Sequence, residues 1–244
     1  MNPLAEFDTQ QLRTRPYITG VDEAGRGALA GPVSAAAFVA KADFYSQNNE
    51  LFDSINDSKK LSPEKRLEIF KYLGELKEQK VVDFECAFSS VEEIEQFNIL
   101  KATAMAMEKA LRALNERLNL NYKRNAPALT LFGESAVDTA QSEIFIDGKP
   151  IKNFEFKHRA IVKGDATCMA IAAASIVAKV SRDLFMDEMG KKYKHYGFEQ
   201  HKGYGTELHC ERIKELGRCP IHRLTFVKTM LSHDKKEDPQ GELF

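Results

Sequence analysis

The chain has no tryptophan and only four cysteines, and no apolar run approaches the roughly 20 residues needed to cross a bilayer. The cysteines are scattered without C-x-x-C spacing, which argues against a disulfide framework and fits free thiols in a reducing compartment. The N-terminus lacks the basic start and apolar stretch of a secretory signal. We therefore expect a cytoplasmic protein that does not enter a membrane.

Net charge is also nearly absent, at −1, so the whole chain exerts no general attraction on nucleic acid. The distribution is less even, because residues 151–230 contain 15 Lys/Arg against 9 Asp/Glu and five of the six histidines. A locally basic face could follow a phosphate backbone, but a solvated helix surface accounts for the same excess. Composition permits a nucleic-acid enzyme without requiring one.

Hydrophobic patterning predicts strands followed by helices. The expected strands cover 16–23, 33–39, 81–89, 128–132 and 143–147, and the expected helices cover 63–77, 98–118, 166–189 and 207–216. Ser62 before Pro63 marks a helix start, Ser90 with Glu93 can form a capping box, and a polar tail follows Leu231. This order predicts an α/β sheet domain over residues 1–190, a helical part over 191–232 and a flexible polar tail over 233–244.

Two adjacent acids, Asp22 and Glu23, precede a glycine-rich turn in the stretch GVDEAGRGALAGPV, residues 20–33. Asp147 and Asp165 lie at two further predicted strand ends, each beside a glycine. Carboxylates gathered at strand ends suit Mg²⁺ or Mn²⁺, and two such ions could support phosphodiester hydrolysis. The acids would hold the cations, and the cations with Arg26 would hold a phosphate.

This interpretation has a geometric difficulty. Successive side chains on a strand point to opposite faces, so Asp22 and Glu23 can share one ion only if the strand ends, bends or bulges there. The alternative is that these are ordinary turn acids, since Asp-Gly is a common turn dipeptide. Spacing alone does not prove that acids up to 143 positions apart converge.

Several motifs resemble those of one nuclease family. The stretch 20–33 resembles the signature of the type 2 ribonucleases H, that is, ribonuclease HII. The similarity continues in the family's order through 57–66, 98–111, 146–148, 163–183, 201–205 and 221–226. It covers most of the chain.

The resemblance implies a ribonuclease-H-like mixed β-sheet flanked by helices, with a helical C-terminal extension. It implies an endonuclease that cuts the RNA strand of RNA–DNA hybrids and cuts 5′ of ribonucleotides embedded in duplex DNA, as in ribonucleotide excision repair and DNA replication. Metal-assisted attack of water would leave 3′-OH and 5′-phosphate ends, with Mn²⁺ or Mg²⁺ as cofactor.

The family's site residues carry over by motif. Asp22, Glu23, Asp147 and Asp165 correspond to the metal-binding catalytic carboxylates. Gly25, Arg26 and Gly27 would read the ribose 2′-OH and hold the adjacent phosphate, because the 2′-OH separates RNA from DNA. Tyr204 would pack against the sugar of the following deoxynucleotide, and Lys59 or Lys60 would touch a phosphate. Ala28 replaces the family's usual proline, and 121–142 looks longer than in typical members.

Two alternatives share part of this pattern. The type 3 ribonucleases H use the same chemistry but carry an additional N-terminal domain, for which Asp22 lies too near the start, and usually have Lys where Arg26 stands. A non-catalytic hybrid-binding or clamp-tethered module is the other, and the presence of all four acids argues against it.

Other signals have weaker support. His209, Cys210, Cys219 and His222 match no standard zinc spacing. Ser175 and Lys179 are one residue too far apart for an S-x-x-K nucleophile motif, so their Ala-rich helix is expected to pack on the sheet. We expect His201 at the surface near the substrate.

The C-terminal residues form a separate hypothesis. Gln240, Leu243 and Phe244 resemble the Q-x-x-L-F peptides that dock on the bacterial sliding clamp. Apolar residues at the end of a polar tail have nothing local to pack against, which favours a partner, although a frayed terminus is an equal alternative.

Overall fold

The computed structural model describes residues 2–13, 15–46, 50–55, 60–125 and 140–237. Its strands are β1 (Tyr17–Ala24), β2 (Val33–Ala40), β3 (Val82–Ser89), β4 (Ser142–Asp147) and β5 (Arg159–Ile161). Its helices are α1 (Pro3–Gln11), α2 (Ala42–Tyr45), α3 (Glu50–Asp53), α4 (Pro63–Glu78), α5 (Val91–Leu118), α6 (Met169–Lys192), α7 (Phe198–His201), α8 (Glu207–Leu216) and α9 (Leu224–Glu237), with one 3₁₀ turn, η1 (Gly164–Ala166).

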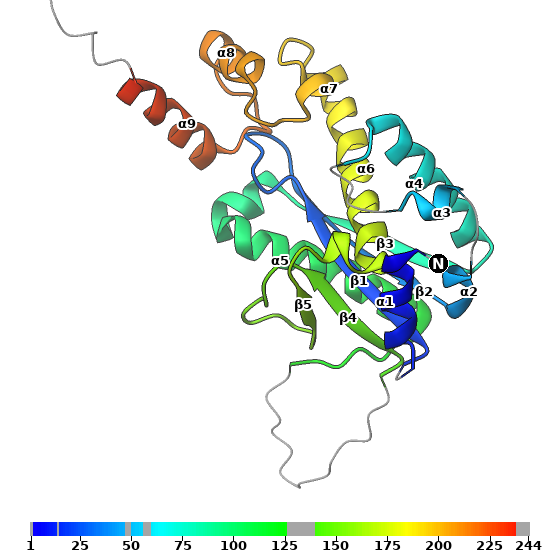
Figure 1. The fold of residues 1–244 in the computed structure, drawn as a ribbon. Coiled ribbons are helices and arrows are strands. Elements are labelled where there is room, and N and C mark those ends of the chain that lie inside the picture. The colour runs from blue at the N-terminus through cyan, green and yellow to red at the C-terminus, as the bar shows by residue number, and fades with distance from the viewer. Residues whose placement is uncertain (1, 14, 47–49, 56–59, 126–139, 238–244) are drawn as a thin grey trace, which may run out of the picture.

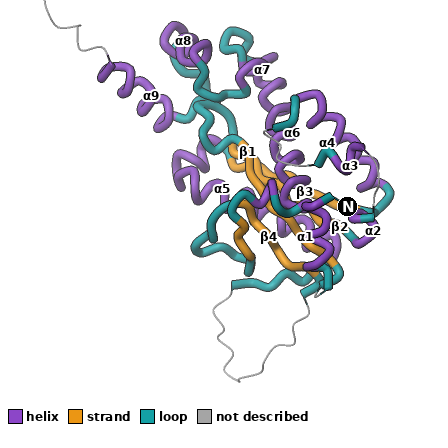
Figure 2. The backbone as a smooth tube through the Cα atoms, viewed as in Figure 1, coloured by secondary structure: helices purple, strands orange, loops and turns teal. Residues whose placement is uncertain are grey.

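The strands form one mixed sheet in the order β3-β2-β1-β4-β5 (Figures 1 and 2). β1 pairs antiparallel with β2, and β2 antiparallel with β3, whereas β1 pairs parallel with β4, and β4 parallel with β5. The central position of β1 places its end at the middle of the sheet edge. This is the α/β architecture that the sequence predicts.

Helices cover both faces of the sheet. Alternate residues of β1 enter two different cores, with Ile18 facing a cluster that includes α4 and α6, and Val21 facing a cluster that includes α5. The two-residue period of a strand produces this division. The helices α7, α8 and α9 gather beyond the edge at which β1 ends (Figure 1).

Local sequence sets the helix starts. Ser62 caps α4 by accepting from the Lys65 N–H, and Ser90 with Glu93 forms the predicted capping box of α5. Within α5, Asn98 leaves helical geometry at φ 67°, and its side-chain oxygen accepts from the N–H groups of Leu100 and Lys101. Asn98 therefore caps the second part of α5, where the sequence predicts the helix to begin.

Three sequence expectations need correction. The N-terminal lead is a helix, α1, and not merely a polar segment. α9 continues to Glu237, so residues 233–237 are helical where the predicted tail begins. β1 remains paired with β2 through Ala24 and Ser34, so the strand neither ends nor bulges at Asp22 and Glu23, which was the condition for these two acids to share one ion.

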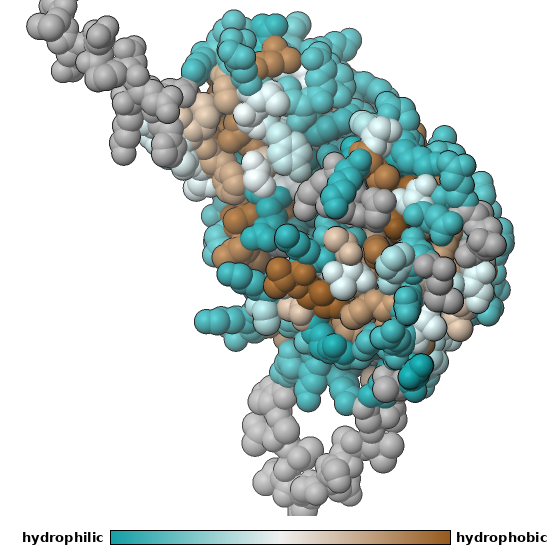
Figure 3. Space-filling view, viewed as in Figure 1, coloured by the Kyte–Doolittle hydropathy of each residue, from teal (hydrophilic) through white to brown (hydrophobic). Residues whose placement is uncertain are grey.

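The predicted strand 128–132 and most of the 121–142 excursion lie outside the described residues. Among the described residues, no helix is both long and apolar enough to span a bilayer. Hydrophilic residues cover most of the face shown in Figure 3, and hydrophobic residues appear there in separate patches.

Candidate active site

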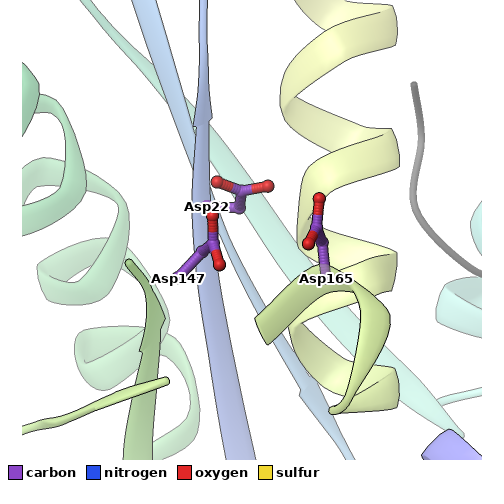
Figure 4. Close-up of side chains that lie close together, drawn as sticks. All are labelled: Asp22, Asp147 and Asp165. Carbon is purple, nitrogen blue, oxygen red and sulfur yellow. The ribbon is translucent and has the colours of Figure 1, made fainter. Parts of the chain in front are cut away.

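Three aspartates from distant parts of the chain meet at the end of β1 (Figure 4). Their carboxylate oxygens, one each from Asp22, Asp147 and Asp165, all lie within 4.8 Å of one another. Asp22 and Asp165 are buried and Asp147 is half-buried. Among the described residues, this is the only such group of three or more potential metal ligands. The convergence expected from the motifs is therefore present for these three residues.

The sheet and one turn create this cluster. Val21 of β1 is in register with Ile146 of the parallel strand β4, so the next residues, Asp22 and Asp147, follow on the same face. Asp165 lies in η1, immediately before α6, and α6 packs on that face of the sheet. The Gly164 N–H donates to Asp147 Oδ1 at 2.6 Å and thereby joins η1 to the end of β4.

Charge crowding perturbs the central acid. Burial raises the pKa of Asp22 well above its ordinary value, and the charges of Glu23 and Asp147 raise it further. Hydrogen bonds from the Glu23 backbone N–H and the Ser175 side chain act in the opposite direction. A hard cation with oxygen ligands would relieve this repulsion, so the donor set fits Mg²⁺ or Mn²⁺.

Glu23 is not part of the three-aspartate group. It follows Asp22 one residue before the end of β1, so its Cα–Cβ bond points away from the face on which Asp22 lies. Its Oε1 accepts from Arg26 Nη1 at 2.9 Å. Glu23 still lies near enough to raise the pKa of Asp22.

The glycine-rich turn begins one residue after β1. Gly25 is buried with φ +91°, whereas Arg26 and Gly27 are exposed. The Gly203 carbonyl accepts from the N–H groups of Leu29 and Ala30, at 2.8 and 3.2 Å. This contact brings the segment that carries Tyr204 against the turn, although the two are far apart in sequence.

Tyr204 is half-buried beside two cations. Arg182 and Lys179 of α6 lie over its ring, 5.2 and 5.4 Å from the centroid. Lys60 is exposed just before α4, and Lys59 lies outside the described residues. Gln240, Leu243 and Phe244 also lie outside them, so their predicted role remains a prediction.

The structure changes the expectations for His201 and Ser175. His201 is only 8% exposed, so its predicted surface position is wrong. His209 and His222 are buried and contact each other through their Nε2 atoms at 3.0 Å. Sequence reasoning treated Ser175 as helix packing and missed its hydrogen bond to Asp22. The i to i+4 spacing of Ser175 and Lys179 placed both on one helix face but did not show what that face meets.

Comparison with known proteins decides the family. The model of the family described as ribonuclease HII matches residues 19–229. The chain belongs to the ribonuclease HII family. Ribonuclease HII of Clostridioides difficile is 40% identical over 215 residues, covering 88% of this chain and 71% of that protein. Ribonuclease HII of Fusobacterium nucleatum is 38% identical over 238 residues, covering 97% of this chain and 95% of that protein.

Solved structures confirm the ribonuclease-H-like fold. Ribonuclease H2 from Pyrococcus horikoshii has a TM-score of 0.61 at 24% identity, covering 90% of this chain and 99% of that one. A Bst-RNase HIII structure in complex with Mn²⁺ has a TM-score of 0.63 at 18% identity, covering 96% and 74%. A PCNA:RNase HII complex from Archaeoglobus fulgidus has a TM-score of 0.58 at 22% identity, covering 86% and 93%. As a ribonuclease HII family member, the chain is a ribonuclease H, a hydrolase with endonuclease activity.

Proposed function

We propose that this ribonuclease HII family member cuts the RNA strand of RNA–DNA hybrids and cuts 5′ of single ribonucleotides embedded in duplex DNA, leaving 3′-OH and 5′-phosphate ends. The observation that carries the proposal is the three-aspartate cluster beside the glycine-rich turn. Such an activity suits ribonucleotide excision and primer removal during DNA replication. Free cysteines and the family assignment favour a cytoplasmic setting.

Asp22, Asp147 and Asp165 would hold one Mg²⁺ or Mn²⁺ ion. Glu23, whose charge already acts on Asp22, would be a ligand to a second ion once its carboxylate leaves Arg26. When bound, the ions supply activation of the attacking water and neutralisation of charge on the phosphodiester. The Ser175 hydrogen bond to Asp22 fixes the orientation of that carboxylate. Asp22 and Asp165 are buried, which limits the movement of their side chains, and the half-buried Asp147 leaves the cluster partly accessible.

The remaining residues would select the ribonucleotide. Gly25, Arg26 and Gly27 lie directly after the strand that carries Asp22, so the turn can contact the 2′-OH and the phosphate beside the cluster. Tyr204 would pack on the next deoxynucleotide sugar, and Lys60, with Lys59, would contact a more distant phosphate. In this assignment residues 1–190 perform the chemistry and 191–232 add to substrate binding.

The first test replaces the central acid. Asp22→Asn keeps the shape of the side chain but removes its charge, so we expect cleavage of a duplex with one embedded ribonucleotide to fall at least about a thousandfold. Hybrid binding should change little. Gel assays with Mg²⁺, with Mn²⁺ and without metal measure the rate, and the wild type should cut only with metal.

Asp83→Asn is the matched control, because Asp83 pairs with Arg117 and Lys77 at the start of β3. This variant should cut at the wild-type rate. A normal rate for Asp22→Asn would contradict the assignment of the cluster.

We also propose that Gln240, Leu243 and Phe244 dock on the sliding clamp. The Q-x-x-L-F pattern at the end of a polar segment supports this proposal. Deletion of residues 240–244 should abolish clamp pull-down while leaving hydrolysis of short duplexes unchanged. Clamp binding by the shortened chain would end the proposal.

A further inference from the structure

Two arginines are fully buried behind the glycine-rich turn. Arg182 of α6 and Arg223, just before α9, are both 0% exposed. Arg223 donates to three backbone carbonyls, from Nη2 to Gly25 at 2.8 Å, from Nη1 to Arg26 at 2.9 Å and from Nε to Gly31 at 2.9 Å. One guanidinium thus contacts both sides of the turn. The planar guanidinium holds its N–H donors in a fixed fork that can reach three carbonyls at once, whereas a lysine ammonium carries all its donors on one nitrogen atom.

Arg182 supports the same segment from α6. It donates to the carbonyls of Ala30, Pro32 and Lys202, at 2.9 to 3.0 Å. A Cβ at Gly25 would lie 2.0 Å from Arg182 Nε, so the turn approaches this side chain as closely as a glycine allows. Both arginines therefore hold the turn from its inner side.

The direction of the carbonyls fixes the direction of the amides. No peptide bond in the described residues is cis, and in a trans peptide the C=O and the N–H point in opposite directions. The Gly25 and Arg26 carbonyls face Arg223, so the N–H groups of Arg26 and Gly27 point away from it. These two residues are exposed, and within the described residues neither N–H donates to an acceptor in the protein.

We propose that Arg223 is a positioning residue for ribonucleotide recognition, because its guanidinium turns the Gly25 and Arg26 carbonyls inward and presents the Arg26 and Gly27 N–H groups to the ribonucleotide. This inference rests on the proposed role of the turn in reading the 2′-OH and its phosphate. Arg223 itself does not touch substrate, since it is fully buried.

The test measures discrimination and not activity alone. Full-length protein carrying Asp22→Asn is titrated with two duplexes of one sequence, one all DNA and the other with a single ribonucleotide. The parent should bind the second duplex more tightly. Adding Arg223→Lys keeps the charge but removes the three-carbonyl fork, so the affinity ratio should fall about tenfold or to one, as expected for a lost hydrogen bond to a charged group.

Affinity for the all-DNA duplex should stay nearly constant, which a general loss of structure would not allow. Arg117→Lys is the matched control, because Arg117 pairs with Asp83 and Glu85 on β3 and should leave the ratio unchanged. An unchanged ratio in folded Arg223→Lys protein would overturn the proposal. A parent without any preference would instead refute ribonucleotide recognition itself.

A second variant tests the same proposal in the event that Arg223→Lys does not fold. Gly27→Pro removes one of the two N–H groups directly, and a Cβ at Gly27 meets no atom within 4 Å. The affinity ratio should fall as it does in Arg223→Lys. Full retention of the ratio in Gly27→Pro would show that the N–H does not contact the substrate and would equally overturn the proposal.

Discussion

His209 and His222 show how single side chains hold the Tyr204 segment. His222 Nδ1 accepts from the Cys219 N–H at 2.9 Å, so its proton lies on Nε2, which donates to His209 Nε2. His209 then carries its proton on Nδ1 and donates to the Tyr204 carbonyl at 2.9 Å. His201 stacks on His209 with ring centroids 4.2 Å apart. The hydrogen bonds require neutral rings, since an added proton on His209 Nε2 would face another N–H.

This arrangement predicts a loss of stability in acid. Burial lowers the pKa of both His209 and His222 to about 4, below the ordinary value of 6.5. As pH falls from about 6.5 to about 4, the unfolded chain binds protons that the folded chain does not, so the free energy of unfolding decreases. Above pH 6.5 this contribution to stability is fully present. Urea unfolding at several pH values measures how steeply the free energy of unfolding changes with pH.

The variant His209→Gln removes one titrating group. Between about pH 4 and pH 6.5, its free energy of unfolding should therefore change less steeply with pH, by up to about 1.4 kcal/mol per pH unit. Burial raises the pKa of Asp8 to about 6, which acts in the opposite direction, but equally in both proteins. His195→Gln, at an exposed histidine, is the control and should keep the wild-type slope. An unchanged slope for His209→Gln would contradict the neutral assignment.

At the scale of elements, the contact between β1 and α6 decides the geometry of the site. Gly20 of β1 lies against the backbone of α6, and a Cβ there would approach the Ala170 carbonyl carbon to 2.1 Å. The alanines over 170–174 are all fully buried, so the helix packs closely on the strand. Because η1 leads directly into α6, this close packing brings Asp165 to Asp22.

Gly20→Ala should therefore destabilise the protein strongly. The added methyl group meets backbone, which cannot rotate away, so we expect a loss of about 3 kcal/mol or failure to fold. Gly74→Ala in α4 is the control, because a Cβ there would meet no atom of another part of the protein within 4 Å. This substitution should be neutral or stabilising by about 0.5–1 kcal/mol. Urea unfolding of both variants gives the comparison, and equal stability would contradict the packing argument.

Local patterns predicted most elements well, for physical reasons. Ser62-Pro63 and the Ser90–Glu93 box are short-range signals, and the helices that they start are present. α1 was missed because its buried Asp8 reads as a surface residue, although its side chain accepts from the Tyr45 hydroxyl and the Ala170 N–H. β5 has only three residues, too few for a periodic signal.

At the scale of the whole molecule, the site could not be derived from spacing alone. Asp22, Asp147 and Asp165 meet because β1 and β4 pair in parallel and α6 returns across them, and no local pattern encodes that pairing. The prediction that these aspartates converge came from the resemblance to ribonuclease HII. The roles of Arg182 and Arg223 were missed because a buried arginine bonded to carbonyls has the same sequence appearance as a surface one.

The position of Arg223 has a consequence for the order in which the protein matures. During synthesis all three aspartates and α6 emerge from the ribosome before Arg223, because they precede it in the sequence. Arg182 of α6 is then already available to the Ala30 and Pro32 carbonyls, whereas the Gly25, Arg26 and Gly31 carbonyls acquire their partner only when Arg223 emerges. With the role proposed for the turn, a nascent polypeptide therefore contains all three aspartates before its means of distinguishing a ribonucleotide is complete.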